Sequence, residues 1–397
     1  VEWQTLGKVL KRTKGTKITA GQMKALHKDN APLKIFAGGK TVAFVDFKDI
    51  PEKDINREPS IIVKSRGIIE FEYYDKPFSH KNEMWSYHSN NDAISIKYIY
   101  YFLKINEGYF QKIGGKMQMP QIATPDTDKF EVPIPCPDNP EKSLAIQSEI
   151  VRILDKFTAL TAELTAELTA ELNMRKKQYN YYRDQLLSFK EGEVEWKALG
   201  TICQIGDGNH SSKYPKANEM IEQGIPFIRG TNMVNGTICN QDMKYISKEK
   251  HNELKKGHLK AFDVLIANRG EVGKVAYVPE GYSGSNLNSQ LAWLRANPEI
   301  IINRYLFFIL CSSTIQNKLS GEGGALQQLT IKNIKNIQIP VPSITVQSNI
   351  VSFLDKFDSL TNSISEGLPR EIELRQKQYE YYRDLLFSFP KPDTVSN

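Results

Sequence analysis

The chain has 397 residues, of which 40% are hydrophobic and 25% are charged, as in ordinary soluble proteins of two to four domains. No apolar run approaches the roughly 20 residues needed to cross a bilayer, which argues against a membrane protein. The net charge of +6 favours a polyanionic partner, and the four cysteines lack the CxxC spacing of a zinc site and suit a reducing cytosol.

The first part of the chain, residues 1–145, is predicted to be a mixed α/β domain. Strands are expected at 41–45 and 60–63, which are rich in β-branched residues. A helix is expected near 94–103, where apolar and aromatic residues have helical spacing. The prolines in 132–137 require an extended chain there, because proline disfavours helix in the residue before it.

A long helix is predicted to follow at 146–190. Its apolar residues recur mostly every four positions, and Thr-Ala-Glu-Leu, a strong helix former, occurs three times in succession at 161–172. Each such unit lengthens a helix by about 6 Å. We favour packing of this helix on its second copy as an antiparallel pair, with packing on its own domain as the alternative. Four of the apolar residues are Leu160, Leu164, Leu168 and Leu172.

The second half of the chain repeats this order. Within a second domain, at 191–344, a strand is predicted at 264–267, a helix at 303–311 and a proline-spaced extended exit at 339–342. Little else is shared by the sequences of the two domains. The last residues, 391–397, are expected to form a C-terminal tail.

The two helical segments are copies of one sequence. Residues 145–189 and 345–389 match at an offset of 200, and both copies carry the motif Gln-Tyr-x-Tyr-Tyr-Arg-Asp. The second copy, predicted as helical at 345–390, contains Gly367 and Pro369, so a break is expected there. The chain is thus a tandem duplication with matching helices and diverged domains.

Catalytic motifs are not found in the sequence. The phosphate-binding GxxxxGK[ST], the Asn/Asp-Pro-Pro-aromatic tetrapeptide of amino-methyltransferases and the metal-binding HExxH are all absent. His210 could coordinate or catalyse, but a histidine in a surface loop is the simpler interpretation. Neither a catalytic site nor a metal site is predicted.

Polar and basic loops are the candidate DNA-binding sites. Basic side chains neutralise phosphates, and Asn, Gln and Arg read base edges through paired hydrogen bonds. Turn or surface structure is the alternative for each loop, and a structural role is the alternative for the arginine of each Arg-Gly pair. The predicted DNA-binding residues are Lys14, Lys17, Lys40, Lys64, Arg66, Lys116, Gln118, His210, Lys213, Arg229, Asn232, Asn268, Arg269, Asn286, Asn288 and Gln327.

The ends of the two helical segments carry Tyr and Arg side chains that cannot all face one core. Adjacent side chains point in different directions around a helix. A patch of Tyr and Arg is typical of a protein interface, with packing against the neighbouring domain as the alternative. The predicted partner-interface residues are Tyr179, Tyr182, Arg183, Tyr379, Tyr382 and Arg383.

Together these features resemble the specificity subunits of type I restriction–modification systems, over essentially the whole chain. The resemblance rests on the two Gln-Tyr-x-Tyr-Tyr-Arg-Asp repeats, on the Glu-Trp-x-x-Leu-Gly openings at 2–7 and 195–200, and on the Thr-Ala-Glu-Leu units, which are like the type IC branch. It implies an α+β fold. The resemblance further implies two target recognition domains joined by two long helices that pack as an antiparallel pair, with pseudo-twofold symmetry.

The resemblance also implies a non-catalytic, cytoplasmic bacterial subunit that binds double-stranded DNA at a bipartite site. Each domain would read one half. Residues 161–172 would set the length of the unread spacer between the halves, and the spacer residues would be Leu160, Leu164, Leu168 and Leu172. The implied partners are two methyltransferase subunits, two restriction/translocase subunits and DNA-mimicking anti-restriction proteins. S-adenosylmethionine, ATP and Mg²⁺ are expected on the partner subunits, and no cofactor on this chain. A self-sufficient DNA modification enzyme and a coiled-coil protein scaffold are the alternatives.

Overall fold

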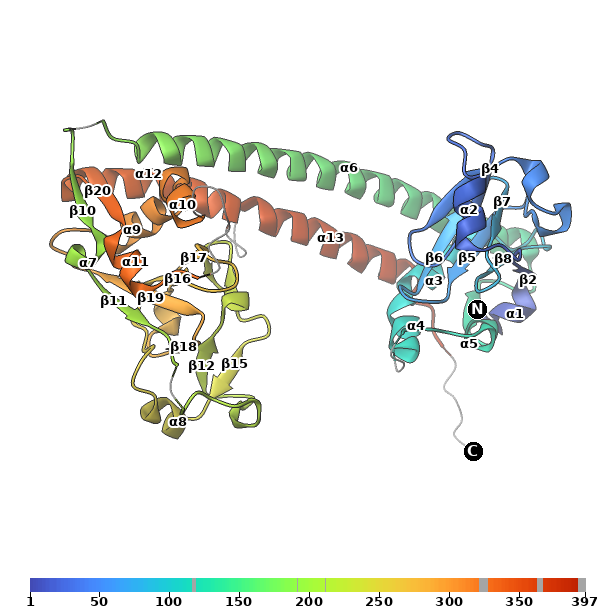
Figure 1. Cartoon of the computed structure of the whole chain (residues 1–397). Helices are drawn as coiled ribbons and strands as arrows, with labels where there is room; N and C mark the ends of the chain where they lie inside the picture. Colours follow the sequence, from blue (N-terminus) through green and yellow to red (C-terminus); the bar gives the residue numbers. More distant parts are fainter. Residues whose placement is uncertain (116–118, 191, 211, 321–327, 363–366, 392–397) are drawn as a thin grey trace. The chain divides into compact units, whose positions relative to one another are not determined.

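The computed structural model describes all residues except 116–118, 191, 211, 321–327, 363–366 and 392–397. The chain divides into two compact units, residues 1–164 with 375–397 and residues 165–374. Each unit holds one mixed domain of helices and sheets together with parts of the long helices (Figure 1). Among the described residues, no helix is both long enough and apolar enough to span a membrane.

The domain of the first unit, domain 1, is built on two sheets. The larger sheet is antiparallel throughout, with the order β2 (Lys11–Lys14), β8 (Trp85–His88), β5 (Ser60–Lys64) and β6 (Glu70–Tyr74). In the smaller sheet β3 and β7 are parallel, and the order is β4 (Val42–Val45), β3 (Leu33–Phe36) and β7 (Phe78–His80). The strands predicted at 41–45 and 60–63 are confirmed.

Helix α3 (Ile96–Ile105) packs against one face of the larger sheet of domain 1. Side chains alternate between the two faces of a strand. Ile61 and Val63 therefore share a core with the buried residues of α3, whereas Ile62 between them packs with phenylalanines of the smaller sheet. This packing explains the helical spacing of apolar residues, and it confirms the helix predicted near 94–103.

The domain of the second unit, domain 2, has the same topology. Its larger sheet is also antiparallel, with the order β11 (Cys203–Asp207), β19 (Leu291–Ala296), β16 (Val264–Ala267) and β17 (Val275–Tyr277). In its smaller sheet β12 and β18 are parallel, and the order is β15 (Lys244–Ile246), β12 (Ile225–Ile228) and β18 (Asn286–Leu287). The predicted homology of the two domains is confirmed, as are the strand at 264–267 and the helix at 303–311, which is α9 (Asn303–Leu310).

Each domain is closed by a short strand pair next to the long helices. In domain 1, β1 (Glu2–Thr5) pairs with β9 (Glu131–Ile134), and in domain 2, β10 (Glu195–Ala198) pairs with β20 (Gln338–Val341). These pairs contain the proline-spaced extended segments that the sequence predicts.

Shorter elements complete both domains. Those of domain 1 are α1 (Leu6–Val9), α2 (Ala20–Leu26), η1 (Phe47–Asp49), η2 (Glu52–Asp54), α4 (Glu107–Gly114) and α5 (Thr124–Asp128). Those of domain 2 are α7 (Leu199–Ile202), η3 (Ala217–Glu219), η4 (Gly230–Asn232), β13 (Met233–Val234), β14 (Thr237–Ile238), α8 (Lys248–Glu253), η5 (Glu280–Tyr282), α10 (Ser313–Ser320) and α11 (Ile331–Asn336).

Helix α6 (Pro140–Leu186) is 47 residues long and runs from the first unit into the second. It begins earlier than the predicted residue 146, because the Asn139 side chain caps it. The Asn139 Oδ1 accepts a hydrogen bond from the Lys142 backbone N–H at 3.0 Å, and the helix opens with proline, which is favoured in a first turn.

The second copy of the helical segment is described as two helices, and residues 363–366, where part of the predicted break falls, lie outside the described residues. Its described parts are α12 (Ile344–Asn362) and α13 (Gly367–Leu386). Pro369 lies in the first turn of α13, where its missing N–H costs no helical hydrogen bond. Gly367 has a φ of 75°, which glycine adopts without strain.

The two copies pack in antiparallel fashion within each unit, as predicted. In the first unit, the Phe157 and Tyr382 rings stack with centroids 5.8 Å apart, and Thr158 Oγ1 hydrogen-bonds the Tyr379 hydroxyl at 3.0 Å. In the second unit, the Tyr182 and Phe357 rings lie 5.9 Å apart. The two ring pairs are equivalent at the offset of 200, so the duplication generates the same helix contact twice.

A fully buried glutamine fastens each domain to its long helix. Gln147 Oε1 accepts from Ser95 N at 2.9 Å, and its Nε2 donates to Ala93 O at 3.0 Å. The equivalent Gln347 accepts from the backbone N–H before α9 and donates to the backbone oxygen two residues earlier, at 2.8 and 3.0 Å. Each amide thus satisfies backbone groups that have no strand or helix partner.

We expect Gln147→Ala and Gln347→Ala each to lower the free energy of unfolding by about 2 kcal/mol, because each substitution leaves buried backbone groups without hydrogen-bond partners. Urea unfolding followed by circular dichroism measures this. The matched control is Gln185→Ala on the exposed side of α6, which should change stability by less than about 0.5 kcal/mol. If all three substitutions lowered the free energy of unfolding equally, the structural role of Gln147 and Gln347 would be contradicted.

Candidate functional site

A basic cavity lies beside the first loop of domain 1. It has a volume of about 560 Å³, and its lining includes three lysines, Lys14, Lys17 and Lys53, and two aspartates, Asp49 and Asp54. None of the three ammonium groups is in an ion pair within the described part of the chain. Gly15 holds the loop close to β7, since a Cβ there would lie 2.4 Å from the His80 carbonyl oxygen. The loop is therefore fixed while its lysines stay free to attract an anion.

Lys14 and Lys17 are sequence predictions that the structure brings together, and Lys53 is a residue that the sequence analysis missed. Lys53 lies in η2, so only the fold places it near the other two. Lys40 is exposed in the turn between β3 and β4, away from the lining of this cavity.

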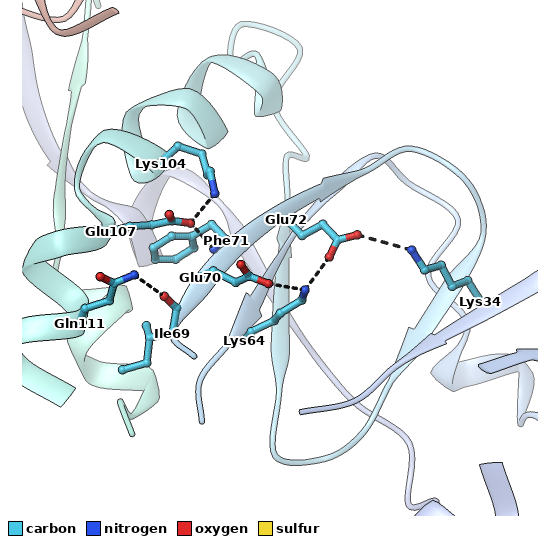
Figure 2. Close-up of polar contacts among 9 residues, drawn as sticks. All are labelled: Lys34, Lys64, Ile69, Glu70, Phe71, Glu72, Lys104, Glu107 and Gln111. Carbon is cyan, nitrogen blue, oxygen red and sulfur yellow. Dashed lines mark hydrogen bonds and ion pairs between the residues drawn. The ribbon is translucent and has the colours of Figure 1, made fainter. Parts of the chain in front are cut away.

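Lys64 has an internal role, which contradicts its predicted contact with DNA. Its side chain is 7% exposed, and its Nζ lies 2.5 Å from Glu70 Oε1 and 2.8 Å from Glu72 Oε2 (Figure 2). Lys34 lies 3.5 Å from the other Glu72 oxygen, so two lysines and two glutamates form a neutral group. Burial acts to lower the pKa of Lys64, but hydrogen bonds to the two carboxylates outweigh it and raise the pKa above the ordinary lysine value.

Arg66 and Arg269 occupy equivalent turns after the central strands β5 and β16. Their backbones form matching bridges, Arg66 with Gln121 and Arg269 with Gln328. The Arg66 Nε donates to the Met119 sulfur at 3.2 Å, and the Arg269 guanidinium faces the Gln328 amide. Both domains keep the backbone bridge, but the two arginine side chains are exposed and make different contacts, so their contact with DNA stays a prediction.

Polar side chains gather at the strand ends of domain 2. Asp207 contacts His210 Nε2 at 2.9 Å through Oδ2, and its Oδ1 accepts from Asn268 Nδ2 at 3.2 Å. His210 is partly exposed, whereas Asn268 is buried, and its Oδ1 has no hydrogen-bond partner among the described residues. Asn288 is also buried and accepts from Gln290 N at 3.2 Å. The sequence analysis missed Asp207, although it stands three residues before His210.

Two predicted base-reading amides of domain 2 are wrong, because they are completely buried and their polar atoms are occupied. The Asn232 Nδ2 donates to Gln241 O at 3.0 Å, and its Oδ1 accepts from Arg229 N at 3.0 Å. Asn286 hydrogen-bonds the His251 ring and lies within β18. Both amides stabilise loops of domain 2, and neither is exposed enough to contact a base.

The other predicted DNA-binding residues divide by location. Lys213 is exposed, and the Arg229 Nη2 donates to the Asp242 backbone oxygen at 2.5 Å. The predicted residues outside the described part of the chain are Lys116, Gln118 and Gln327. Among the residues that are described, no group of three or more His, Cys, Asp or Glu side chains is arranged to hold a metal ion.

Only some of the tyrosines predicted to contact a partner protein lie on the surface. Tyr179 is 6% exposed and joins the core of domain 2, which contradicts its assignment to a partner interface, and desolvation raises its pKa strongly. Tyr182 and Tyr382 stay exposed. Tyr181 and Tyr381 of the same Tyr and Arg patches, which are not among the predicted interface residues, are more exposed, at 62% and 64%.

The arginines of the two motifs are held in the same way. Arg183 pairs with Asp184 at 3.0 Å and lies over the Tyr179 ring, and Arg383 pairs with Asp384 at 2.7 Å and lies over the Tyr379 ring. The repeated motif therefore presents the same outward face, formed by its second and third tyrosines, in each unit.

A family model for the type I restriction modification DNA specificity domain matches residues 2–174 and again residues 191–374. The chain belongs to this family. It is 42% identical over 406 residues to the EcoR124I/EcoR124II specificity subunit of Escherichia coli, covering 100% of this chain and 96% of the relative. It is 34% identical over 310 residues to a putative type I restriction enzyme specificity subunit of Haemophilus influenzae, covering 76% and 74% of the two chains.

A solved structure has a fold similar to that of this chain. One chain, from a study of complex assembly and conformational transition of the type I R-M system, superposes with a TM-score of 0.62 at 15% identity, covering 97% of both chains. At that identity the likeness concerns the fold alone.

Replacing Lys64 by Met should lower the free energy of unfolding by about 2 kcal/mol, because Glu70 and Glu72 would lose their shared cation in a largely buried place. Denaturant unfolding of the purified protein tests this. Lys17→Met is the matched control, since Lys17 is exposed and its loss should leave stability unchanged. A Lys64→Met protein as stable as the control would restore Lys64 as a candidate DNA contact.

Proposed function

We propose that the chain is the non-catalytic specificity subunit of a type I restriction–modification enzyme and reads a bipartite site in double-stranded DNA. One half of the site is read by domain 1 and the other half by domain 2. The observation that carries the proposal is the presence of two domains with one topology and different polar surfaces, each fastened to the same duplicated helices.

The two domains offer different chemistry to DNA, which supports two unlike half-sites. Domain 1 contributes the cavity with Lys14, Lys17 and Lys53, which suits the phosphate backbone. Domain 2 contributes the partly exposed His210, fixed by Asp207. A histidine ring nitrogen can hydrogen-bond a base edge or a phosphate. Because phosphate contacts position a protein and base contacts specify the sequence, the two surfaces would contribute differently.

Residues 161–172 of α6 act in this proposal as a spacer between the reading domains. They form part of one continuous helix that runs across the boundary of the two units at Leu164 and Thr165. One Thr-Ala-Glu-Leu unit adds about 6 Å and roughly 40° beyond a full helical turn. One base pair adds about 3.4 Å and roughly 35°. The rotation added by one unit is therefore close to that of one base pair. The length added by one unit is less than that of two base pairs.

The proposed partners dock on the helical segments. Two methyltransferase subunits would bind the outward tyrosines of the two units, and two restriction/translocase subunits would join the complex. S-adenosylmethionine, ATP and Mg²⁺ belong to those partners in this proposal, DNA-mimicking anti-restriction proteins would compete for the DNA surface, and the complex would work in the bacterial cytoplasm. Aromatic side chains exposed on a helix are frequent in protein interfaces, which supports this assignment.

Deleting Thr165 to Leu168 should shorten the unread spacer by one or two base pairs and leave both half-site sequences unchanged. Genome-wide mapping of methylated adenines, in cells that carry the methyltransferase subunit and either version of the chain, gives spacer and half-sites together. The double substitution Thr165→Ala and Thr169→Ala keeps the length of the helix and should keep the spacer. A deletion that changes the half-site bases, or leaves the spacer as it was, would refute the spacer role.

A further inference from the structure

The last strand of the larger sheet in domain 1 is only half covered along its outer edge. Among the residues that the structure describes, the strand order ends at β6, so one side of β6 has no neighbouring strand. Side chains of α4 cover part of that side. The Phe71 N–H donates to Glu107 Oε1 at 2.8 Å, and the Gln111 Nε2 donates to the Ile69 oxygen at 3.1 Å (Figure 2).

The next outward N–H along this edge is the backbone N–H of Tyr73. In an antiparallel strand, residues two positions apart direct their N–H groups to the same side. Since the Phe71 N–H points away from β5 to Glu107, the Tyr73 N–H also points outward. Within the described part of the chain it has no acceptor.

Tyr277 is the equivalent residue in domain 2, and its N–H is covered. In the sheet registers Tyr73 lies opposite Ile61 and Tyr277 lies opposite Val264, at matching places on the central strands. A cation lies over each ring, Lys97 over Tyr73 at 5.5 Å and Arg304 over Tyr277 at 5.0 Å. In domain 2, however, the Tyr277 N–H donates to the Gly236 oxygen at 2.8 Å.

The acceptor in domain 2 comes from a hairpin that domain 1 lacks. Strands β3 and β4 are joined by residues 37–41, whereas the equivalent β12 and β15 are joined by residues 229–243, which contain the hairpin of β13 and β14. Its turn is Asn235-Gly236, with φ values of 50° and 75°, the conformation that Asn-Gly favours in tight hairpins. A Cβ on Gly236 would lie 2.8 Å from the Phe307 ring, so the turn packs closely beside β17.

The hairpin turn reaches the motif-bearing helix of its own unit. Asn235 and Gly236 line a cavity of about 300 Å³ together with Tyr179 and Arg183 of α6. At the offset of 200, the corresponding side chains of the first unit are Tyr379 and Arg383. By this correspondence, the uncovered edge of β6 faces the Tyr379 and Arg383 side of the helix end whose second and third tyrosines we propose for partner docking.

We propose that an extended segment of the methyltransferase subunit binds the β6 edge of domain 1 and accepts the Tyr73 N–H, as Gly236 accepts the Tyr277 N–H in domain 2. This inference rests on the proposed function of the chain. Addition of a partner segment to an exposed strand edge is a common mode of protein recognition, and edges left open are otherwise protected. Glu107 and Gln111 limit the binding to the Tyr73 end of the strand.

The inference makes the two docking sites unequal in a defined way. In the second unit the chain supplies its own acceptor, and a partner meets a closed edge. In the first unit the partner supplies the acceptor and gains a backbone hydrogen bond. The same methyltransferase subunit would thus make one contact in the first unit that it cannot make in the second.

The test compares Tyr73→Pro with Tyr73→Ala in the full chain. Both lose the ring, but only proline lacks the N–H, and proline is tolerated on an edge strand where the N–H faces outward. The two free proteins should therefore melt at similar temperatures. In calorimetric titration with the methyltransferase subunit, Tyr73→Pro should bind its site on the first unit about tenfold more weakly than Tyr73→Ala.

The same pair of substitutions at Tyr277 is the internal control. There the N–H is bonded within the chain, so Tyr277→Pro should melt at a lower temperature than Tyr277→Ala, with no additional loss of partner binding once folded. Hydrogen exchange gives a direct measurement: the Tyr73 amide should exchange rapidly in the free chain and slowly in the complex.

Equal partner affinities for Tyr73→Pro and Tyr73→Ala, or rapid exchange of the Tyr73 amide in the complex, would overturn the inference. Those results would leave the proposed function standing if the complex still methylated a bipartite site. Loss of methylation with the wild-type chain would instead count against the function itself.

Discussion

Each domain is completed by helix residues from both copies of the duplicated segment, and the rest of the structure depends on that exchange. Phe157 stacks on Tyr382 in one unit, and Tyr182 packs on Phe357 in the other. Since every such contact takes one residue from each copy, neither copy can finish a unit alone. The repeat at an offset of 200 residues therefore has a physical reason. The start of each copy packs against the end of the other copy, so both copies must carry the same two contact surfaces.

The contacts that both units keep are the ones that fasten a domain to its helix. Gln147 and Gln347 bind equivalent backbone groups, and Lys97 pairs with Asp155 as Arg304 pairs with Asp355. Away from these positions the domains differ. Domain 1 has a neutral group of lysines and glutamates around Lys64 and Glu72, whereas the equivalent residues of domain 2 are the buried Ala267 and Ala276. Attachment is thus common to both domains, whereas the surfaces suited to reading DNA are not.

Sequence reasoning succeeded where a single local rule decides the structure. Proline spacing predicted the extended segments, Gly367 and Pro369 predicted the helix break, and repeated motifs predicted the duplication of the domains. It failed where long-range packing decides. Nothing local indicates that Lys64 lies between two glutamates from the next strand, that Tyr179 is core while Tyr182 is surface, or that Lys53 joins Lys14. The Asn235-Gly236 turn was a readable hairpin signal, but its role as a cover for Tyr277 follows only from the sheet order.

The most direct test maps methylated adenines across the genome of cells that express the partner methyltransferase subunit with or without this chain. Our account predicts that methylation requires the chain and falls on one motif, made of two unlike short sequences separated by a fixed number of unread bases. A single continuous motif, two identical halves, or methylation that persists without the chain would contradict it.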